Sequence, residues 1–130
     1  ELEGTLKFWS FTDELNVMAK VFEGRHPQVD VVYTMIPMTD GEFQTKIKAA
    51  VGTADAPDVV ALEAAFVKEW VEADILADLN DLLPLTEELK TYSFAVETAT
   101  HDGITKGYSY QATPGAFEYR RSIAPDRIHC

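Results

Sequence analysis

The stretch "GTLKFWSFTDE", residues 4–14, decides the fold expected of this chain. Residues 5–11 are rich in aromatic and apolar side chains, which predicts a β-strand. A helical pattern follows at once, with apolar side chains spaced at i, i+3, i+4 and i+7: Leu15, Met18, Ala19 and Phe22. Thr12 is suited to cap this helix, and the acids Asp13 and Glu14 favour the positive end of its dipole. The sequence therefore predicts a change from strand to helix within this stretch.

The same strand-then-helix pattern is repeated twice further along the chain. Residues 29–36 form a nearly continuous run of apolar and β-branched side chains, which suits a strand covered on both faces. Thr39 and Glu42 have the spacing of a capping box, so a helix is expected to follow. Residues 57–64 predict a third strand, and the apolar pattern of residues 65–76 predicts a third helix.

This order of elements predicts an α/β fold, with a parallel sheet that has helices on both faces. A further helix, capped by Thr86 and ending before Gly103, is expected after the third strand and helix. Sheets of this kind bind ligands beyond the carboxyl ends of their strands. The residues between the first strand and its helix lie at one such end, so a ligand site is expected there.

Several functional classes are excluded by what the sequence contains. The formal net charge is −11, which argues against nucleic acid as a partner. None of the motifs GxGxxG, GxxxxGK[ST] and GxSxG is present, and no histidine falls beside a strand end where Ser10 would need a base. The three histidines are scattered and lack the spacing of metal ligands. No cofactor, metal or catalytic residue is therefore expected, and the chain is not expected to be an enzyme.

The predicted strand ends combine aromatic rings with carboxylate, amide and hydroxyl groups. This combination suits a sugar, because the C–H face of a sugar ring packs on an aromatic plane while planar polar groups bind its hydroxyls. The candidate ligand-binding residues are Trp9, Phe11, Thr12, Asp13, Asp40, Glu63, Tyr110, Gln111 and Thr113. Trp9 has the alternative of packing in the core, and Asp13 that of serving only as a charge at a helix start. Glu63 follows an apolar strand, where a buried unpaired carboxylate would be costly, so a packing role does not explain it.

Four segments together resemble the family 1 extracellular solute-binding proteins, the sugar-capturing components of ABC importers: "GTLKFWSF", "VFEGRHPQVDVVY", "APDVVALEAAFVKEWVEADILADL" and "YSYQATPGAFEYRRSIA". The resemblance extends over nearly the whole chain and implies a periplasmic-binding-protein fold, in which two α/β lobes joined by hinge strands close on a ligand. Ligand contacts in that family come from the loops after the strands and from the segment that crosses between lobes. By position, the resemblance implies contacts from Phe11, Asp13, Glu63, Gln111 and Thr113.

The resemblance also implies a division of the chain and a set of partners. Residues 1–107 would form the N-terminal α/β lobe, and residues 108–130 the crossing toward an absent second lobe, with an ending unlike that of the family. The implied partners are a carbohydrate ligand and an ABC permease in the membrane. The implied location is outside the cytoplasm, in a periplasm or lipid-anchored at a cell surface. A sheet edge left uncovered in a truncated lobe would favour self-association.

Two other classes of function remain open from the sequence. One is a small α/β enzyme of flavodoxin-like topology, which would need a nucleophile or a phosphate loop that the sequence does not contain. The other is an oligomerising module in which a second copy supplies the missing parts, and light scattering distinguishes it from a monomeric binding lobe.

Overall fold

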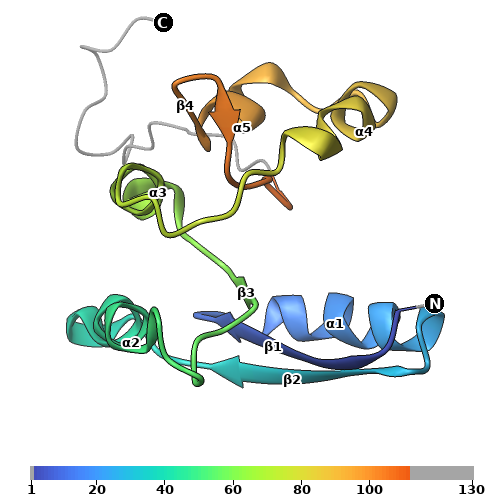
Figure 1. Ribbon diagram of the computed structural model, residues 1–130, viewed down its shortest axis with the longest axis vertical. Helices are drawn as coiled ribbons and strands as arrows, with labels where there is room; N and C mark the ends of the chain where they lie inside the picture. The colour runs from blue at the N-terminus through green and yellow to red at the C-terminus, as the bar shows by residue number, and fades with distance from the viewer. Residues whose placement is uncertain (1, 112–130) are drawn as a thin grey trace, which may run out of the picture.

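The computed structural model describes residues 2–111, and these residues form an α/β structure (Figure 1). Its elements in chain order are β1 (Gly4–Ser10), α1 (Glu14–Arg25), β2 (Val29–Met35), the short helical turn η1 (Thr39–Gly41), α2 (Glu42–Ala50), β3 (Val59–Val60), α3 (Ala64–Glu72), the turn η2 (Asn80–Leu82), α4 (Leu83–Glu88), α5 (Ser93–Glu97), β4 (Thr100–His101) and β5 (Ile104–Thr105).

The sheet that the sequence predicts is present, and β1 is its central strand. The strand order is β2-β1-β3, and both pairings are parallel. β1 pairs with β2 along its whole length, and its residues Phe8 and Trp9 pair with β3. The Trp9 carbonyl also accepts a hydrogen bond of 2.9 Å from the Ala61 amide, so the pairing with β3 continues past the strand itself. Because the three strands run in the same direction, the loops that follow them all begin at the same end of the sheet, where the carboxyl ends of the strands lie.

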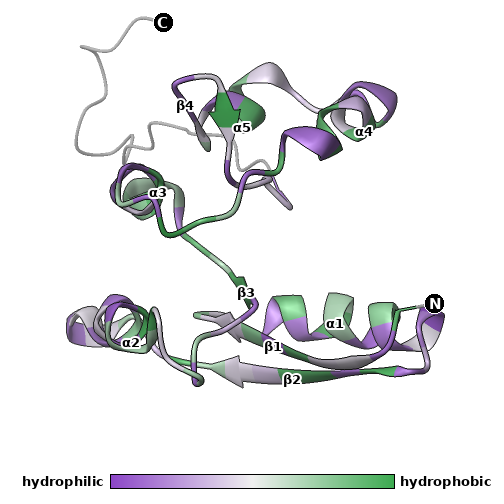
Figure 2. Ribbon diagram, in the orientation of Figure 1, coloured by the Kyte–Doolittle hydropathy of each residue, from purple (hydrophilic) through white to green (hydrophobic). Residues whose placement is uncertain are grey.

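The connections between the strands place helices on both faces of the sheet. The chain steps from β1 to β2 on one side and then back across β1 to reach β3. Right-handed crossovers in this order put α1 and α2 on opposite faces. Figure 2 shows hydrophilic and hydrophobic stretches alternating along both helices, as expected where one side of a helix packs on a sheet. The fold class predicted from the sequence is therefore confirmed.

The core lies between α2, α3 and the end of β2. Four side chains, each no more than 3% exposed, form its centre: Ile36, Phe43, Ile47 and Trp70. Partly buried residues from the strand ends and the following helices pack around them: Trp9, Phe11, Met38, Val60, Leu62, Phe66 and Leu76. The core thus reaches the edge of the sheet at which the three loops begin.

The part of the chain after α3 differs from the single helix expected there. α4 and α5 are short, and an antiparallel hairpin of β4 and β5 follows them. The turn of the hairpin is Asp102 and Gly103, which both have positive φ (50° and 78°), as a two-residue turn of this kind requires. The Thr98 and Thr100 hydroxyls donate to carbonyls one turn back in the chain at the end of α5. Thr86 does not cap a helix either, because it lies inside α4 and its hydroxyl donates to the Leu83 carbonyl.

Two expectations about the burial of side chains are wrong. Met18 was expected on the buried face of the first helix with Leu15 and Ala19, but it is 48% exposed while the other two are buried. The second strand was expected to be covered on both faces, yet β2 is an outer strand of the sheet and Val32 is 45% exposed. The strand with neighbours on both sides is β1, whose apolar run is interrupted by a lysine.

Two expectations about local structure also differ. The capping box of Thr39 and Glu42 does not form, because the backbone passes through left-handed conformations at Asp40 and Gly41 (φ 52° and 74°) before α2 begins. The third strand is shorter than predicted, since only Val59 and Val60 meet the pairing pattern.

We expect Ile47→Ala to destabilise this chain by about 2–5 kcal/mol, because it removes buried side-chain volume at the centre of the core. The matched control is Leu89→Ala, which truncates a side chain that is 68% exposed and should change stability by no more than about 0.5 kcal/mol. Urea unfolding of the two variants measures the difference. Equal midpoints for both would contradict the assignment of this core.

Candidate functional site

The loop after β1 is shaped by two hydroxyl groups. Ser10 is fully buried, and its Oγ accepts a hydrogen bond of 3.2 Å from the Thr12 amide. Thr12 Oγ1 in turn accepts from the Glu14 amide at 3.3 Å. These bonds satisfy amide groups at the start of α1 that the helix itself leaves without partners. Thr12 is not the N-cap of α1 as expected, because that position is Asp13, but its hydroxyl accepts from the amide of the first helical residue, Glu14.

The aromatic residues at this strand end are held against the core. Phe11 is half-buried and meets Phe43 of α2 edge to face, with the ring centroids 5.8 Å apart. Trp9 is also half-buried and packs on the same core cluster. Both rings thus have a packing role, and both retain surface that is accessible to solvent.

One exposed carboxylate follows each of the three parallel strands. They are Asp13 after β1, Asp40 after β2 and Glu63 after β3. Asp13 Oδ1 accepts a hydrogen bond of 3.3 Å from Asn16. Glu63 is the N-cap residue directly before α3, and its backbone is extended. The sequence suggested a functional role for Glu63 because a buried unpaired carboxylate would be costly. That argument does not apply, because the Glu63 side chain is exposed.

Tyr110 comes near enough to Glu14, at the start of α1, for the charge of Glu14 to affect it, although the two are about a hundred residues apart in sequence. Burial raises the pKa of the Tyr110 phenol, and the charges of Glu14 and Tyr33 raise it further. Tyr33 is itself joined to this loop, because its hydroxyl donates to the Thr12 carbonyl at 2.5 Å and its ring meets Phe8 edge to face. Hydrogen bonds thus join Thr12 to both Tyr33 and Glu14, and Tyr110 is near enough to Glu14 and Tyr33 for their charges to affect its pKa.

The other predicted residues are placed as follows. Gln111 is exposed, and its backbone carbonyl accepts a hydrogen bond of 2.5 Å from Ser109. Thr113 lies outside the described residues. Asp40 and Glu63 follow strands that run parallel to β1, so they come at the same carboxyl end of the sheet as Asp13. The sequence indicated Glu14 only as a charge at the start of a helix and did not indicate Tyr33, because nothing in a single sequence shows that Tyr110 comes near them.

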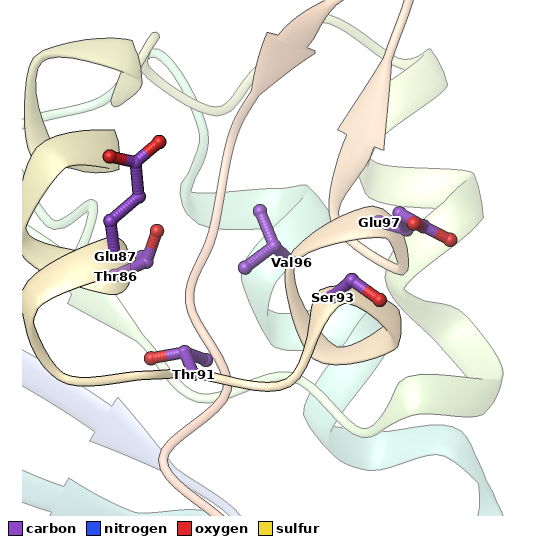
Figure 3. A pocket seen from close by; sticks show the side chains of 6 residues that line it. All are labelled: Thr86, Glu87, Thr91, Ser93, Val96 and Glu97. Atoms are coloured by element: carbon purple, nitrogen blue, oxygen red, sulfur yellow. The ribbon is translucent and has the colours of Figure 1, made fainter.

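We use the term strand-end rim for the candidate residues at the carboxyl ends of the strands. They are Trp9, Phe11, Thr12, Asp13, Asp40, Glu63 and Tyr110. A separate hollow of about 290 Å³ lies between α4 and α5 (Figure 3). Its lining residues come only from that part of the chain: Thr86, Glu87, Thr91, Ser93, Val96 and Glu97. It contains no aromatic ring and none of the predicted site residues, so the strand-end rim is the better candidate for a carbohydrate site.

The described residues contain neither a cluster of metal-binding side chains nor a helix suited to span a membrane. Within residues 2–111, no three side chains of the metal-binding types lie together. No helix in that range is both long enough and apolar enough to cross a bilayer.

Comparison with known proteins shows the family. The family model of the bacterial extracellular solute-binding proteins matches residues 9–112. The chain therefore belongs to the bacterial extracellular solute-binding protein family. A comparison with curated protein sequences gives no significant match.

Solved structures of similar proteins agree with this assignment. One is the GacH receptor of Streptomyces glaucescens, described in complex with acarbose. It is 33% identical with a TM-score of 0.69, and the match covers 81% of this chain and 28% of that one. An ABC substrate-binding protein from Listeria monocytogenes in complex with cycloalternan is 24% identical with a TM-score of 0.61, over 80% of this chain and 28% of that one. The sugar-binding protein MalE from Xanthomonas citri is 24% identical with a TM-score of 0.66, over 80% and 27%. The chain thus spans little more than a quarter of the length of these proteins.

We expect Glu14→Gln to lower the pKa of Tyr110 toward the ordinary tyrosine value, because it removes a nearby negative charge. NMR titration of ring-labelled tyrosine measures this, with Tyr110→Phe to assign the signal and Glu97→Gln as a distant control. A raised pKa in the folded state means that the stability gained from the neutral phenol is present below pH 10 or so and is lost as the pH rises through the raised value. An unchanged Tyr110 pKa in Glu14→Gln would contradict the proximity of the two residues.

Proposed function

We propose that this chain is part of the substrate-binding component of an ABC importer, which captures a sugar or oligosaccharide outside the cytoplasm and delivers it to a membrane permease. Membership of the solute-binding family supports the class of function. The complex of the GacH receptor with acarbose supports a carbohydrate as the ligand, since that receptor is 33% identical to this chain. The proposed protein is a receptor and not an enzyme.

The observation that carries the proposal is the composition of the strand-end rim. Three exposed carboxylates, Asp13, Asp40 and Glu63, follow three neighbouring parallel strands. The half-buried rings of Trp9 and Phe11 lie at the same edge. Carboxylates accept hydrogen bonds from sugar hydroxyls, and an aromatic plane supports the apolar face of a sugar ring. We assign Gln111 and Thr113 to the same site from their place in the crossing segment.

The proposed mechanism is closure of two lobes on the ligand. In this proposal residues 1–107 belong to the first lobe, and the segment from residue 108 onward belongs to the crossing toward the second lobe. Closure removes the sugar from water and creates the surface that the permease recognises. Each lobe supplies part of the contact area, so affinity depends on both.

We therefore expect this chain alone to bind oligosaccharides weakly or not at all, and a protein that contains both lobes to bind them in a saturable way. Titration calorimetry with a panel of oligosaccharides measures both. Tight binding by the isolated chain would contradict two-lobed capture, and no binding of any oligosaccharide by the two-lobed protein would contradict the carbohydrate function.

In the two-lobed protein, Asp13→Asn should weaken oligosaccharide binding about tenfold, since a charge-assisted hydrogen bond to a hydroxyl is replaced by a neutral one. Asp30→Asn is the matched control, because Asp30 is an exposed aspartate near the amino end of β2, away from the rim. Calorimetry compares the dissociation constants of the two variants. An equal effect of both substitutions would show that Asp13 has no part in the site.

A further inference from the structure

The segment that leads from β5 to Tyr110 has little regular structure of its own. No strand or helix is assigned to residues 106–111, so the backbone there lacks the repeated hydrogen bonds that fix a sheet or a helix. This segment nevertheless brings Tyr110 near enough to Glu14 and Tyr33 for their charges to add to the effect of burial in raising the pKa of its phenol. Something other than secondary structure must set its direction.

The first anchor is Asn80, which follows α3 in the turn η2. Its Oδ1 accepts a hydrogen bond of 2.9 Å from the Thr105 amide, and its Nδ2 donates to the Gly103 carbonyl at 3.3 Å. The neighbouring Leu79 amide donates to the Thr105 carbonyl at 2.8 Å. The side chain of Asn80 thus acts with the backbone of Leu79 as a short additional strand beside β5, and Thr105 is 1% exposed as a result.

The second anchor is Lys106, the residue directly after β5. Its Nζ donates to Asp74, which lies just beyond the end of α3 and has a left-handed backbone (φ 54°). The Lys106 side chain is only 9% exposed, whereas that of Asp74 is 88% exposed. Lys106 lowers the pKa of the Asp74 carboxyl through this hydrogen bond and its charge, so Asp74 is ionised at neutral pH.

Two further contacts continue the same attachment toward the crossing. The Lys106 amide donates to the Ala99 carbonyl at 2.9 Å, and the Tyr108 hydroxyl donates to the Leu79 carbonyl at 3.0 Å. Thr105, Lys106 and Tyr108 are therefore each fastened to the loop after α3 or to the end of α5. None of these contacts involves a residue of the strand-end rim.

We propose that Asn80 and Lys106 are positioning residues: by fastening the chain between Thr105 and Tyr108, they direct the crossing segment so that Tyr110 comes near Glu14 and Tyr33 at the strand-end rim. They act on the ligand site without touching the ligand. This inference rests on the proposed function only for its effect on carbohydrate affinity, because the position of Tyr110 is measurable without any ligand.

The test uses the full chain and follows the Tyr110 pKa by NMR in Asn80→Ala and Lys106→Met. Loss of either anchor should expose Tyr110 to water and let it move away from Glu14, so that its pKa falls toward the ordinary tyrosine value. Lys68→Met is the matched control, because it removes a lysine that pairs with Glu72 on the surface of α3 and should leave Tyr110 unchanged. Asn80→Asp keeps the acceptor for the Thr105 amide and should preserve the Tyr110 pKa better than Asn80→Ala.

A second measurement separates positioning from a merely structural role. Amide hydrogen exchange at Thr105 should become faster in Asn80→Ala, because its side-chain partner is gone. If Thr105 exchanges faster while the Tyr110 pKa stays raised in both variants, the anchors hold the hairpin alone and the inference is overturned.

The effect on binding is measured in the two-lobed protein, where each variant should weaken oligosaccharide affinity about five- to tenfold, comparable to the loss of a hydrogen bond. If the unaltered two-lobed protein binds no oligosaccharide, the proposed function is contradicted. The role of Asn80 and Lys106 in positioning Tyr110 is not affected by that result, because the Tyr110 pKa tests it separately. Unchanged affinity in variants whose Tyr110 pKa has fallen would overturn the link between the crossing and the site.

Discussion

The structure depends on the parallel pairing of β1 with β2 on one side and β3 on the other. The backbone of β1 has neighbours on both sides at Phe8 and Trp9, so its amide and carbonyl groups are paired there as its burial increases toward Ser10. Parallel pairing also needs long connections, and these are the helices α1 and α2 that cover the sheet. The same pairing puts the ends of three strands at one edge, which is why Asp13, Asp40 and Glu63 share a rim while they are widely separated in sequence.

Packing and polar chemistry overlap at this rim. Phe11 and Trp9 contact the core through Phe43 and its neighbours, and the carboxylates that follow the strands remain in water. This arrangement gives rigid rings beside solvated acceptors without burying an unpaired charge. Hydrogen bonds of Ser10, Thr12 and Tyr33 hold the backbone of the loop after β1. For the proposed carbohydrate site, a loop held in this way would lose less conformational entropy on binding.

The sequence predicted elements well where one local pattern dominated. The predicted bounds agree within a few residues with the structure for the strands that begin at Gly4 and Val29 and for the helix that begins at Glu14. Strand and helical periods of apolar residues differ clearly in these segments. The sequence pattern predicts a helix up to Gly103 and not the hairpin at Asp102 and Gly103, although an Asp-Gly pair is a known signal for a two-residue turn. The apolar spacing before the turn fits a helix, and the short strands β4 and β5 have too few residues for a strand period. The capping box at Thr39 failed for another reason, because the left-handed residues that follow it change the direction of the chain.

The sequence by itself determined the fold class and which strand ends carry aromatic and acidic side chains, because periodicity and local composition encode both directly. The family followed from the resemblance of four segments to known solute-binding proteins and from the family model that matches residues 9–112. Only the tertiary structure decided that β1 and not β2 is central, that Glu63 is exposed, and that Tyr110 lies beside Glu14 and Tyr33. These facts depend on contacts between residues that are far apart in the chain. A local pattern does not contain them, because the same strand or turn can form with many different partners.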